Sequence, residues 1–209
     1  FENLTFKGRI MKADLHSHTT YSDGHLDVKQ LIDLAKKEHL DFLAITDHDI
    51  LTGAKLAREL TKHEALEIIV GIELSTYHNE ESVHILGYFP PATDTEKLEK
   101  FLLKQQQARE TRAKKILELL HKHFNIRINP VLLERYETIT RGSIADMIQE
   151  SGYFYEKSEI FDKFLGDGAK AYIPSTKLPT KEGIQILKDA GAIAVLAHPV
   201  LLKKSKVEE

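Results

Sequence analysis

The stretch DLHSHTTYSDG (residues 14–24) places two histidines and an aspartate close together in the chain: His16, His18 and Asp23. The spacing His16-x-His18 directs both imidazoles to the same side of an extended segment, where two nitrogens can bind one cation. Asp23 adds carboxylate oxygens to these nitrogens. The stretch therefore predicts one part of a metal site.

Four further residues of the same chemical kind lie at the ends of other predicted strands. His48, Glu73 and His198 come at strand carboxyl ends, and His84 lies near the start of a strand. Because the carboxyl ends of parallel strands share one face of an α/β fold, we expect these side chains to meet. A nitrogen and oxygen set without sulfur favours Mn, Zn or Fe. The number of ligands exceeds the need of one ion, so at least two ions are predicted.

Each of these residues also has a structural interpretation when it is taken alone. Glu73 could be a buried carboxylate with satisfied hydrogen bonds, and His84 could be a packed histidine. Asp47 or Asp49 in the motif ITDHD could cap the helix that follows. The metal site is preferred because these alternatives would have to coincide. Six other histidines are expected at the surface: His25, His39, His63, His78, His121 and His123.

Short apolar runs alternate with amphipathic helical patterns and supply the elements that must position these residues. Strands are predicted at 11–16, 41–48, 66–74, 83–89 and 192–199. A helical stripe begins near Leu26, with Asp27 as a plausible N-cap, and further helices follow at 52–64 and 180–191. Strands that alternate with helices predict an α/β architecture with mostly parallel strands.

Residues 95–172 depart from this alternation. They read as one long amphipathic helix over 95–124 followed by shorter helices, with no convincing strand. We interpret them as a helical insertion in a domain made of residues 11–94 and 173–209. Residues 1–10 resemble a protease-site linker of the kind added for protein expression, and they are left out of the fold prediction.

Composition narrows the class of protein. A dedicated DNA-binding protein carries an excess of positive charge, whereas this chain has a net charge of −3 and a pI near 6.4. No DNA-binding motif is found in the sequence either. The absence of cysteine excludes disulfides and thiolate metal sites, and it agrees with a cytoplasmic location. No apolar run approaches 18 residues, so no membrane partner is expected. The oligomeric state is left open.

The motifs DLHSHTTYSDG, AITDHD, GIELS, VHILGY and AVLAHP, in this order, resemble those of the PHP (polymerase and histidinol phosphatase) superfamily of metal-dependent phosphoesterases. Asp23 and the helical insertion are similar to the branch that contains 3′,5′-nucleoside bisphosphate phosphatases and 5′-to-3′ exoribonucleases. The resemblance implies a distorted (β/α)7 barrel that holds two or three divalent ions, Mn²⁺ in preference to Zn²⁺, Fe²⁺ or Mg²⁺. The metal ligands that it implies are His16, His18, Asp23, His48, Glu73, His84 and His198.

The resemblance also implies a reaction. A metal-activated hydroxide would hydrolyse phosphate esters of small nucleotides, such as 3′,5′-bisphosphates, or of RNA 5′ ends. Asp23, His48 and Arg141 are expected in catalytic roles, and Asp23, Arg109 and Arg141 in substrate binding. A guanidinium can hold a phosphate through two hydrogen bonds. For Arg109 a solvated helix face is the alternative.

One departure from the family pattern bears on this prediction. The family's last motif, an Asp-x-His that supplies two more ligands, is missing from the sequence, so we expect that the C-terminal part of the barrel is not included. The missing motif favours an alternative, a non-catalytic module that binds nucleotides or RNA ends. A second alternative is histidinol phosphatase, which Asp23 and the helical insertion disfavour.

Overall fold

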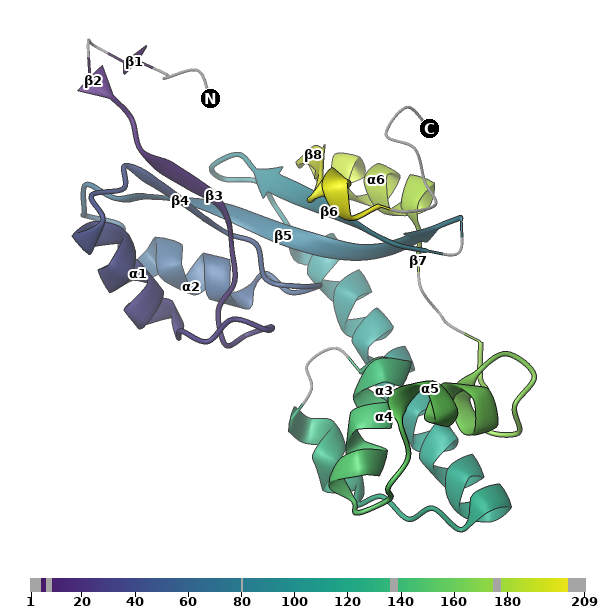
Figure 1. The fold of residues 1–209 in the computed structure, drawn as a ribbon. Coiled ribbons are helices and arrows are strands. Elements are labelled where there is room, and N and C mark those ends of the chain that lie inside the picture. Colours follow the sequence, from purple (N-terminus) through teal and green to yellow (C-terminus); the bar gives the residue numbers. More distant parts are fainter. Residues whose placement is uncertain (1–4, 7–8, 80, 136–138, 175–177, 203–209) are drawn as a thin grey trace. The chain divides into compact units, whose positions relative to one another are not determined.

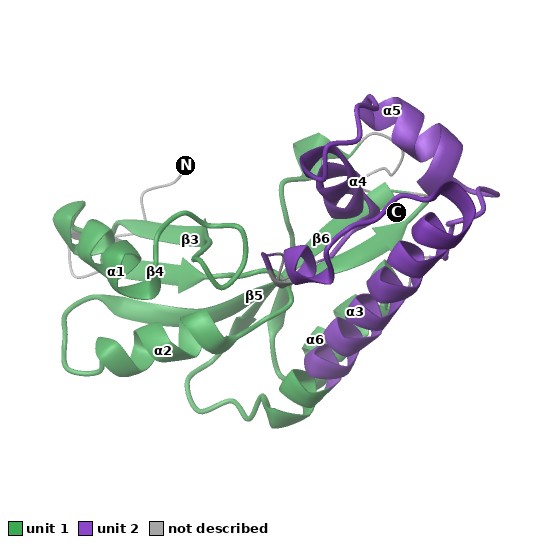
Figure 2. Cartoon of the chain, turned by 90° about the horizontal axis from the view of Figure 1, so that it is seen from below, with its two compact units in different colours: residues 1–100, 177–209 green, residues 101–176 purple. Residues whose placement is uncertain are grey.

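The computed structural model describes residues 5–6, 9–79, 81–135, 139–174 and 178–202. The chain divides into two compact units, residues 1–100 with 177–209 and residues 101–176 (Figure 2). Within the predicted linker 1–10, β1 (Thr5–Phe6) and β2 (Arg9–Ile10) form a short antiparallel pair. The rest of that linker and the predicted barrel residues 203–209 lie outside the described residues.

The first unit is built on one mixed sheet. Its strands are β3 (Ala13–Ser17), β4 (Phe42–Ile45), β5 (Glu67–His78), β6 (Glu81–Phe89), β7 (Leu178–Pro179) and β8 (Ile193–Leu196). The order is β3-β4-β5-β6-β8, with β7 paired to β5. The predicted α/β class is confirmed. Within the described residues the sheet is open, with β3 and β8 at its two edges, so the predicted barrel is not seen closed.

Helices cover this sheet and connect its strands. They are α1 (Val28–Lys37), α2 (Thr52–Leu60) and α6 (Thr180–Asp189), and a short 3₁₀ turn, η3 (Pro199–Leu201), follows β8. Figure 1 shows α1 and α2 beside β3, β4 and β5, and α6 beside β6 and β8. These helices bury their apolar stripes on the strands, which fixes where the strand ends lie.

The start of α1 shows how the sequence sets an element boundary. The Asp27 carboxylate accepts a hydrogen bond from the backbone N–H of Gln30, and the Gln30 side chain accepts one from the backbone N–H of Asp27. Such a reciprocal cap stabilises a helix by about 1 kcal/mol. The predicted N-cap is confirmed, and the helix begins immediately after the loop that carries Asp23.

In the described sheet, β6 is the strand that runs opposite to the others. β3, β4 and β5 are parallel, whereas β6 is antiparallel to both β5 and β8. β5 is longer than the predicted strand 66–74, because its outer half pairs with β6 as a hairpin. His84 therefore lies opposite Ser75, near the amino end of β6. That end of an antiparallel strand lies beside the carboxyl ends of its parallel neighbours, which places His84 at the predicted edge.

In the described residues of the second unit, the regular elements are all helices or helical turns. Its elements are α3 (Glu96–Phe124, whose first turn belongs to the first unit), η1 (Pro130–Arg135), α4 (Arg141–Glu150), α5 (Lys157–Ile160) and the π-helical turn η2 (Phe161–Leu165). Ile116, Leu120, Ile144 and Ile148 are among the fully buried residues of its apolar core. Although α3 is long, no helix in the described part of the chain has the apolar character that a membrane span requires.

Candidate metal centre

Glu73 is the centre of the site. Its side chain is 1% exposed, and both carboxylate oxygens contact histidine nitrogens. Oε2 lies 2.8 Å from Nε2 of His16 and 3.0 Å from Nε2 of His18. Oε1 lies 2.8 Å from Nδ1 of His84 and 2.8 Å from Nε2 of His198. A single buried carboxylate thus joins two pairs of imidazoles that come from both ends of the sequence.

His48 and Asp23 complete the group. Nε2 of His48 lies 3.7 Å from Glu73 Oε2 and 3.7 Å from Asp23 Oδ2, and Nδ1 of His18 lies 3.3 Å from Asp23 Oδ1. Asp23 is the outermost member, with 68% of its side chain exposed. The structure therefore brings together all seven residues that the sequence predicts as metal ligands. The other six histidines are exposed, as predicted.

The five imidazoles surround Glu73 as a closed ring. Neighbouring ring centroids are 4.9 to 5.8 Å apart, in the order His16, His18, His48, His84, His198 and back to His16. A ring of imidazole nitrogens around one carboxylate is a donor set that suits a divalent cation.

Backbone pairing explains why residues so distant in sequence converge. β4 ends at Ile45, but the chain continues alongside β5, and His48 forms a parallel bridge with Glu73. The backbone N–H of Glu73 donates to the Asp47 carbonyl (3.2 Å), and the N–H of Asp49 donates to the Glu73 carbonyl (3.1 Å). Neither Asp47 nor Asp49 caps α2, whose N-cap Leu51 makes no side-chain hydrogen bond, so that alternative is wrong.

The environment shifts the pKa values of three residues in the site. For Glu73, burial would raise the pKa, but hydrogen bonds from His18, His84 and His16 together with the charge of His48 hold it far below the usual range. For His18, burial opposes the charged form, yet the hydrogen bond to Glu73 and the charge of Asp23 raise the pKa. Burial lowers the pKa of His48. Glu73 is thus an anion, as a metal ligand must be.

The donor atoms have the spacing of a coordination sphere. Nε2 of His16, Nε2 of His18 and Oε2 of Glu73 form a triangle with sides of 2.8, 3.0 and 3.1 Å. Ligands at metal bond lengths of roughly 2.0–2.2 Å lie about 3 Å apart when they are adjacent around one ion. Two overlapping groups lie beside this one, His18 with Asp23 and His48, and His48 with Glu73 and His84. The residues fit divalent cations, and sharing Glu73 fits more than one.

The two predicted substrate arginines lie in the second unit, in α3 (Arg109) and at the start of α4 (Arg141). Arg141 donates to the Leu165 carbonyl and to the Asp167 carboxylate (3.2 Å each), and its guanidinium lies 5.3 Å from the centre of the Tyr172 ring. Their predicted contact with substrate phosphate stays a prediction.

Arg112 is a neighbour of Arg141 that the sequence prediction missed. Its Nε and Nη2 donate to the backbone carbonyls of Ile173 and Pro174 at 2.7 to 3.1 Å. Burial, followed by the charge of Arg141, lowers the pKa of Arg112. The helical pattern marks Arg109 and Arg112 as neighbours on one helix, but it contains no signal that separates their roles.

Comparison with known proteins agrees with this geometry. A family model described as the PHP domain matches residues 14–172. The 5′-3′ exoribonuclease Rnm of Escherichia coli is 35% identical over 193 residues, which cover 89% of this chain and 64% of that protein. The 3′,5′-nucleoside bisphosphate phosphatase of Chromobacterium violaceum is 28% identical over 196 residues, covering 91% of this chain and 67% of that protein.

A solved structure is similar over nearly the whole chain. It comes from Bifidobacterium adolescentis, is assigned to the metal-dependent phosphoesterases, and is 30% identical. The TM-score is 0.66, and the match covers 95% of this chain and 72% of that one. The chain thus spans less than two thirds of the E. coli relative, although nearly all of its own length takes part in these matches.

Proposed function

The chain belongs to the PHP domain family of metal-dependent phosphoesterases, and we propose that it hydrolyses phosphate esters of nucleotides, at RNA 5′ ends or in 3′,5′-bisphosphates. The observation that carries the proposal is the buried Glu73 carboxylate with four histidine nitrogens within 3.0 Å of its oxygens. The E. coli and C. violaceum relatives, named for these two activities, support the choice of substrate class.

The residues of the centre would hold two or three divalent ions, for which Mn²⁺ is our first choice. When bound, such ions activate water as a nucleophile and offset the charge of the phosphoryl oxygens. His16 and His18 would hold one side of the centre and His84 and His198 the other, with Glu73 between them. His48 would share Glu73 with His84 and Asp23 with His18.

Asp23 and the two arginines have different parts in this proposal. Asp23 is the most exposed member of the centre, so its carboxylate would face the incoming phosphate ester while it also holds metal. Arg109 and Arg141 would bind phosphate oxygens of the substrate, because a planar guanidinium offers two parallel donors. Arg141 is one third exposed and donates through one nitrogen, Nη1, in the contacts above, which leaves further donors for an anion.

The same family membership supports a closed sheet. Two edges, β3 and β8, flank the described sheet, and their last residues lead into His18 and His198. Closure of these edges into a distorted (β/α)7 barrel would surround the centre on every side. A barrel of this kind presents ligands from the carboxyl ends of its strands, as the described sheet already does for His16, His48 and Glu73.

Hydrolysis with a loaded metal centre tests the proposal. We expect phosphate release from adenosine 3′,5′-bisphosphate, or nucleotide release from a 5′-phosphorylated RNA oligonucleotide, in the presence of Mn²⁺. His16→Ala removes one Glu73 partner and is expected to abolish this activity. His63→Ala, a change at an exposed histidine outside the ring, is the matched control and should keep it.

Three outcomes would contradict the proposal. Full activity in the metal-free protein would mean that the metal centre takes no part in hydrolysis. Faster hydrolysis of histidinol phosphate than of either nucleotide substrate would favour the histidinol phosphatase alternative. Nucleotide binding without turnover, at saturating Mn²⁺ and with a full-length protein, would identify a binding module.

A further inference from the structure

Asp47 is a charged side chain that the metal centre does not use, although it is as deeply buried as Glu73. It is 1% exposed and lies two residues after the end of β4. Its carboxylate accepts three hydrogen bonds of 2.7 Å each: Oδ1 from the Thr19 backbone N–H and the Ser22 hydroxyl, and Oδ2 from the Thr19 hydroxyl. All three donors belong to the loop that joins β3 to α1. Asp47 therefore anchors this loop to the next strand of the sheet.

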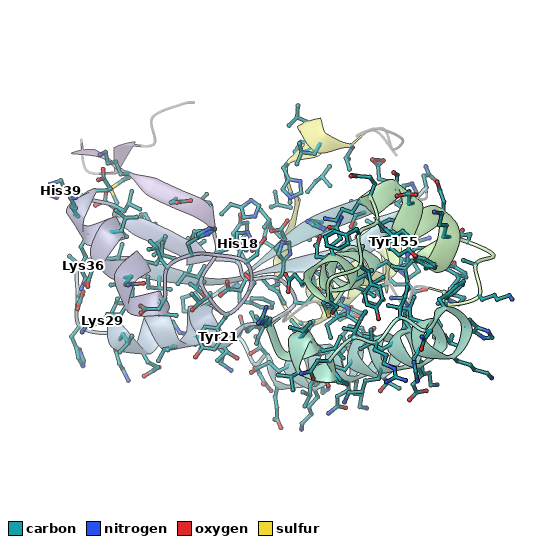
Figure 3. The ribbon with its side chains drawn as sticks, turned by 60° about the horizontal axis from the view of Figure 1, so that its bottom comes forward. His18, Tyr21, Lys29, Lys36, His39 and Tyr155 are labelled. Carbon is teal, nitrogen blue, oxygen red and sulfur yellow. The ribbon has the colours of Figure 1, made fainter. Side chains whose placement is uncertain are left out.

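The anchored loop carries two of the proposed metal ligands, His18 and Asp23. Figure 3 shows His18 and Tyr21 on this loop. Within the loop, the backbone N–H groups of Ser22 and Gly24 both donate to the Thr19 carbonyl at 3.0 Å. The turn is tight, because a Cβ at Gly24 would lie 2.3 Å from the His18 carbonyl oxygen. A loop held at Thr19 and folded this tightly gives Asp23 little freedom to move relative to His18.

Ser22 connects Asp47 to the histidine itself. A hydroxyl has one hydrogen, and here it points to Asp47 Oδ1, its nearest acceptor. The lone pairs of the same oxygen are then left for Nδ1 of His18, which is 3.3 Å away. Oδ1 of Asp23, also 3.3 Å from this nitrogen, is a second acceptor. Both neighbours favour a hydrogen on Nδ1, so that Nε2, which lies 3.0 Å from Glu73 Oε2, is the nitrogen that would bind a cation in place of its hydrogen bond to Glu73.

We propose that Asp47 and Ser22 are positioning residues, which fix the orientation and tautomer of His18 and hold Asp23 beside it, so that the loop is preorganised for a divalent cation. The proposal rests on the proposed function only in taking the centre to bind metal. A metal-bound histidine typically donates its other N–H to an oxygen acceptor, and loss of that acceptor typically weakens metal binding by about 10–100-fold. Here the acceptor would be Ser22, held in place by Asp47.

The chain contains a matched control for Ser22. Ser17 lies between the two histidines of the H-x-H motif, and its hydroxyl donates to the Ala44 carbonyl (2.7 Å). Ser17→Ala and Ser22→Ala therefore each remove a hydroxyl that donates one hydrogen bond of 2.7 Å, and both residues lie at or just after the carboxyl end of β3. They differ in that the Ser22 hydroxyl links Asp47 to His18.

Calorimetric titration of the whole chain with Mn²⁺ tests the proposal without any substrate. We expect Ser22→Ala to weaken Mn²⁺ binding about 10–100-fold, and Ser17→Ala to change it about twofold or less. In the Zn²⁺-loaded protein, nitrogen chemical shifts should show His18 protonated at Nδ1 in the wild type and a mixture of tautomers in Ser22→Ala. Equal Mn²⁺ affinities for the two serine variants would overturn the proposal.

Substitutions of Asp47 separate hydrogen-bond geometry from folding. Asp47→Asn keeps an oxygen that can accept from the Thr19 N–H and the Ser22 hydroxyl, so Mn²⁺ affinity should stay within a few-fold of the wild type. Asp47→Ala should lose as much affinity as Ser22→Ala or more. An Asp47→Asn protein that folds but binds Mn²⁺ as weakly as Asp47→Ala would overturn the proposed link from Asp47 through Ser22 to His18.

The two proposals fail in different ways. If the wild type binds Mn²⁺ but hydrolyses no nucleotide substrate, the proposed function fails and the positioning roles are still decided by the titrations. If the wild type hydrolyses a nucleotide substrate and Ser22→Ala binds Mn²⁺ normally, the positioning roles alone fail. A wild type that binds no divalent metal overturns both.

Discussion

The histidine centre and the arginine cluster of the helical unit differ in how their positions are determined. In the centre, each ligand lies on or just after a strand, and the pairing of the strands fixes where it points. In the helical unit, Arg112 and Arg141 lie beside each other, and Arg112 gives its donors to backbone carbonyls. Arg141 gives one nitrogen, Nη1, to the Leu165 carbonyl and the Asp167 carboxylate, so the number of donors committed to the protein is what separates the two arginines.

The largest effect is expected from Glu73→Gln. The change keeps the volume of the side chain but removes the charge that two pairs of imidazoles share. Loss of a residue behind a ligand typically costs about 10–100-fold in metal affinity or activity, so loss of a shared ligand should cost on the order of 10³-fold or more. Bound metal, measured by mass spectrometry after dialysis, and the rate of hydrolysis should fall together.

The control for this change is an acidic residue in the other region. Asp167→Asn alters a carboxylate that contacts Arg141, and it should leave the bound metal unchanged. If Glu73→Gln retained its metal, Glu73 would be a structural carboxylate. The histidine centre would then be a structural feature, as the Arg112 contacts of the helical unit are.

The second effect is a stabilisation by metal. A ligand that binds only the folded state at about 100 times its Kd stabilises that state by about 2.7 kcal/mol. For a chain of this length this corresponds to a rise in Tm of roughly 5–10 °C. Scanning calorimetry after chelation, with and without added Mn²⁺, should show the rise in the wild type and in His63→Ala. Glu73→Gln should show no rise, and a wild type without one would not bind metal at its histidine centre.

The sequence predicted the members of the centre because strand topology places residues that follow parallel strands at one edge. His16, His48 and Glu73 are explained in this way. His84 could not be placed with the same argument, because it lies near the amino end of its strand, and the direction of β6 depends on its long-range pairing with β5 and β8. Local sequence does not encode that direction.

Other features stayed hidden for similar reasons. Asp47, like Asp49, could be a helix cap on the sequence alone, since an aspartate before a helix commonly is one. Its true partners, Thr19 and Ser22, are distant in sequence and belong to another strand's loop. In α3, Arg109 and Arg112 fit one amphipathic pattern equally well, and what distinguishes Arg112 is its contact with Ile173 and Pro174.

The smallest effects are expected from lysine substitutions of the two neighbouring arginines. Arg112→Lys loses the fork that contacts the Ile173 and Pro174 carbonyls and should reduce the free energy of unfolding by about 1–2 kcal/mol, with little change in KM. Arg141→Lys keeps a positive charge but loses bidentate phosphate binding. We expect it to raise KM about tenfold, which is about 1.4 kcal/mol, and to leave the Mn²⁺-induced rise in Tm unchanged.

Steady-state kinetics and thermal unfolding on the same two variants decide between the roles. A higher KM without a loss of stability identifies a substrate contact, whereas a lower Tm with an unchanged KM identifies an architectural one. Arg109→Lys belongs in the same series, because Arg109 is the other proposed phosphate contact, and it should behave as Arg141→Lys does. If Arg112→Lys raised KM and left Tm unchanged, Arg112 would bind substrate in spite of its carbonyl partners. Backbone hydrogen bonds could then no longer be used to separate architecture from chemistry in this unit.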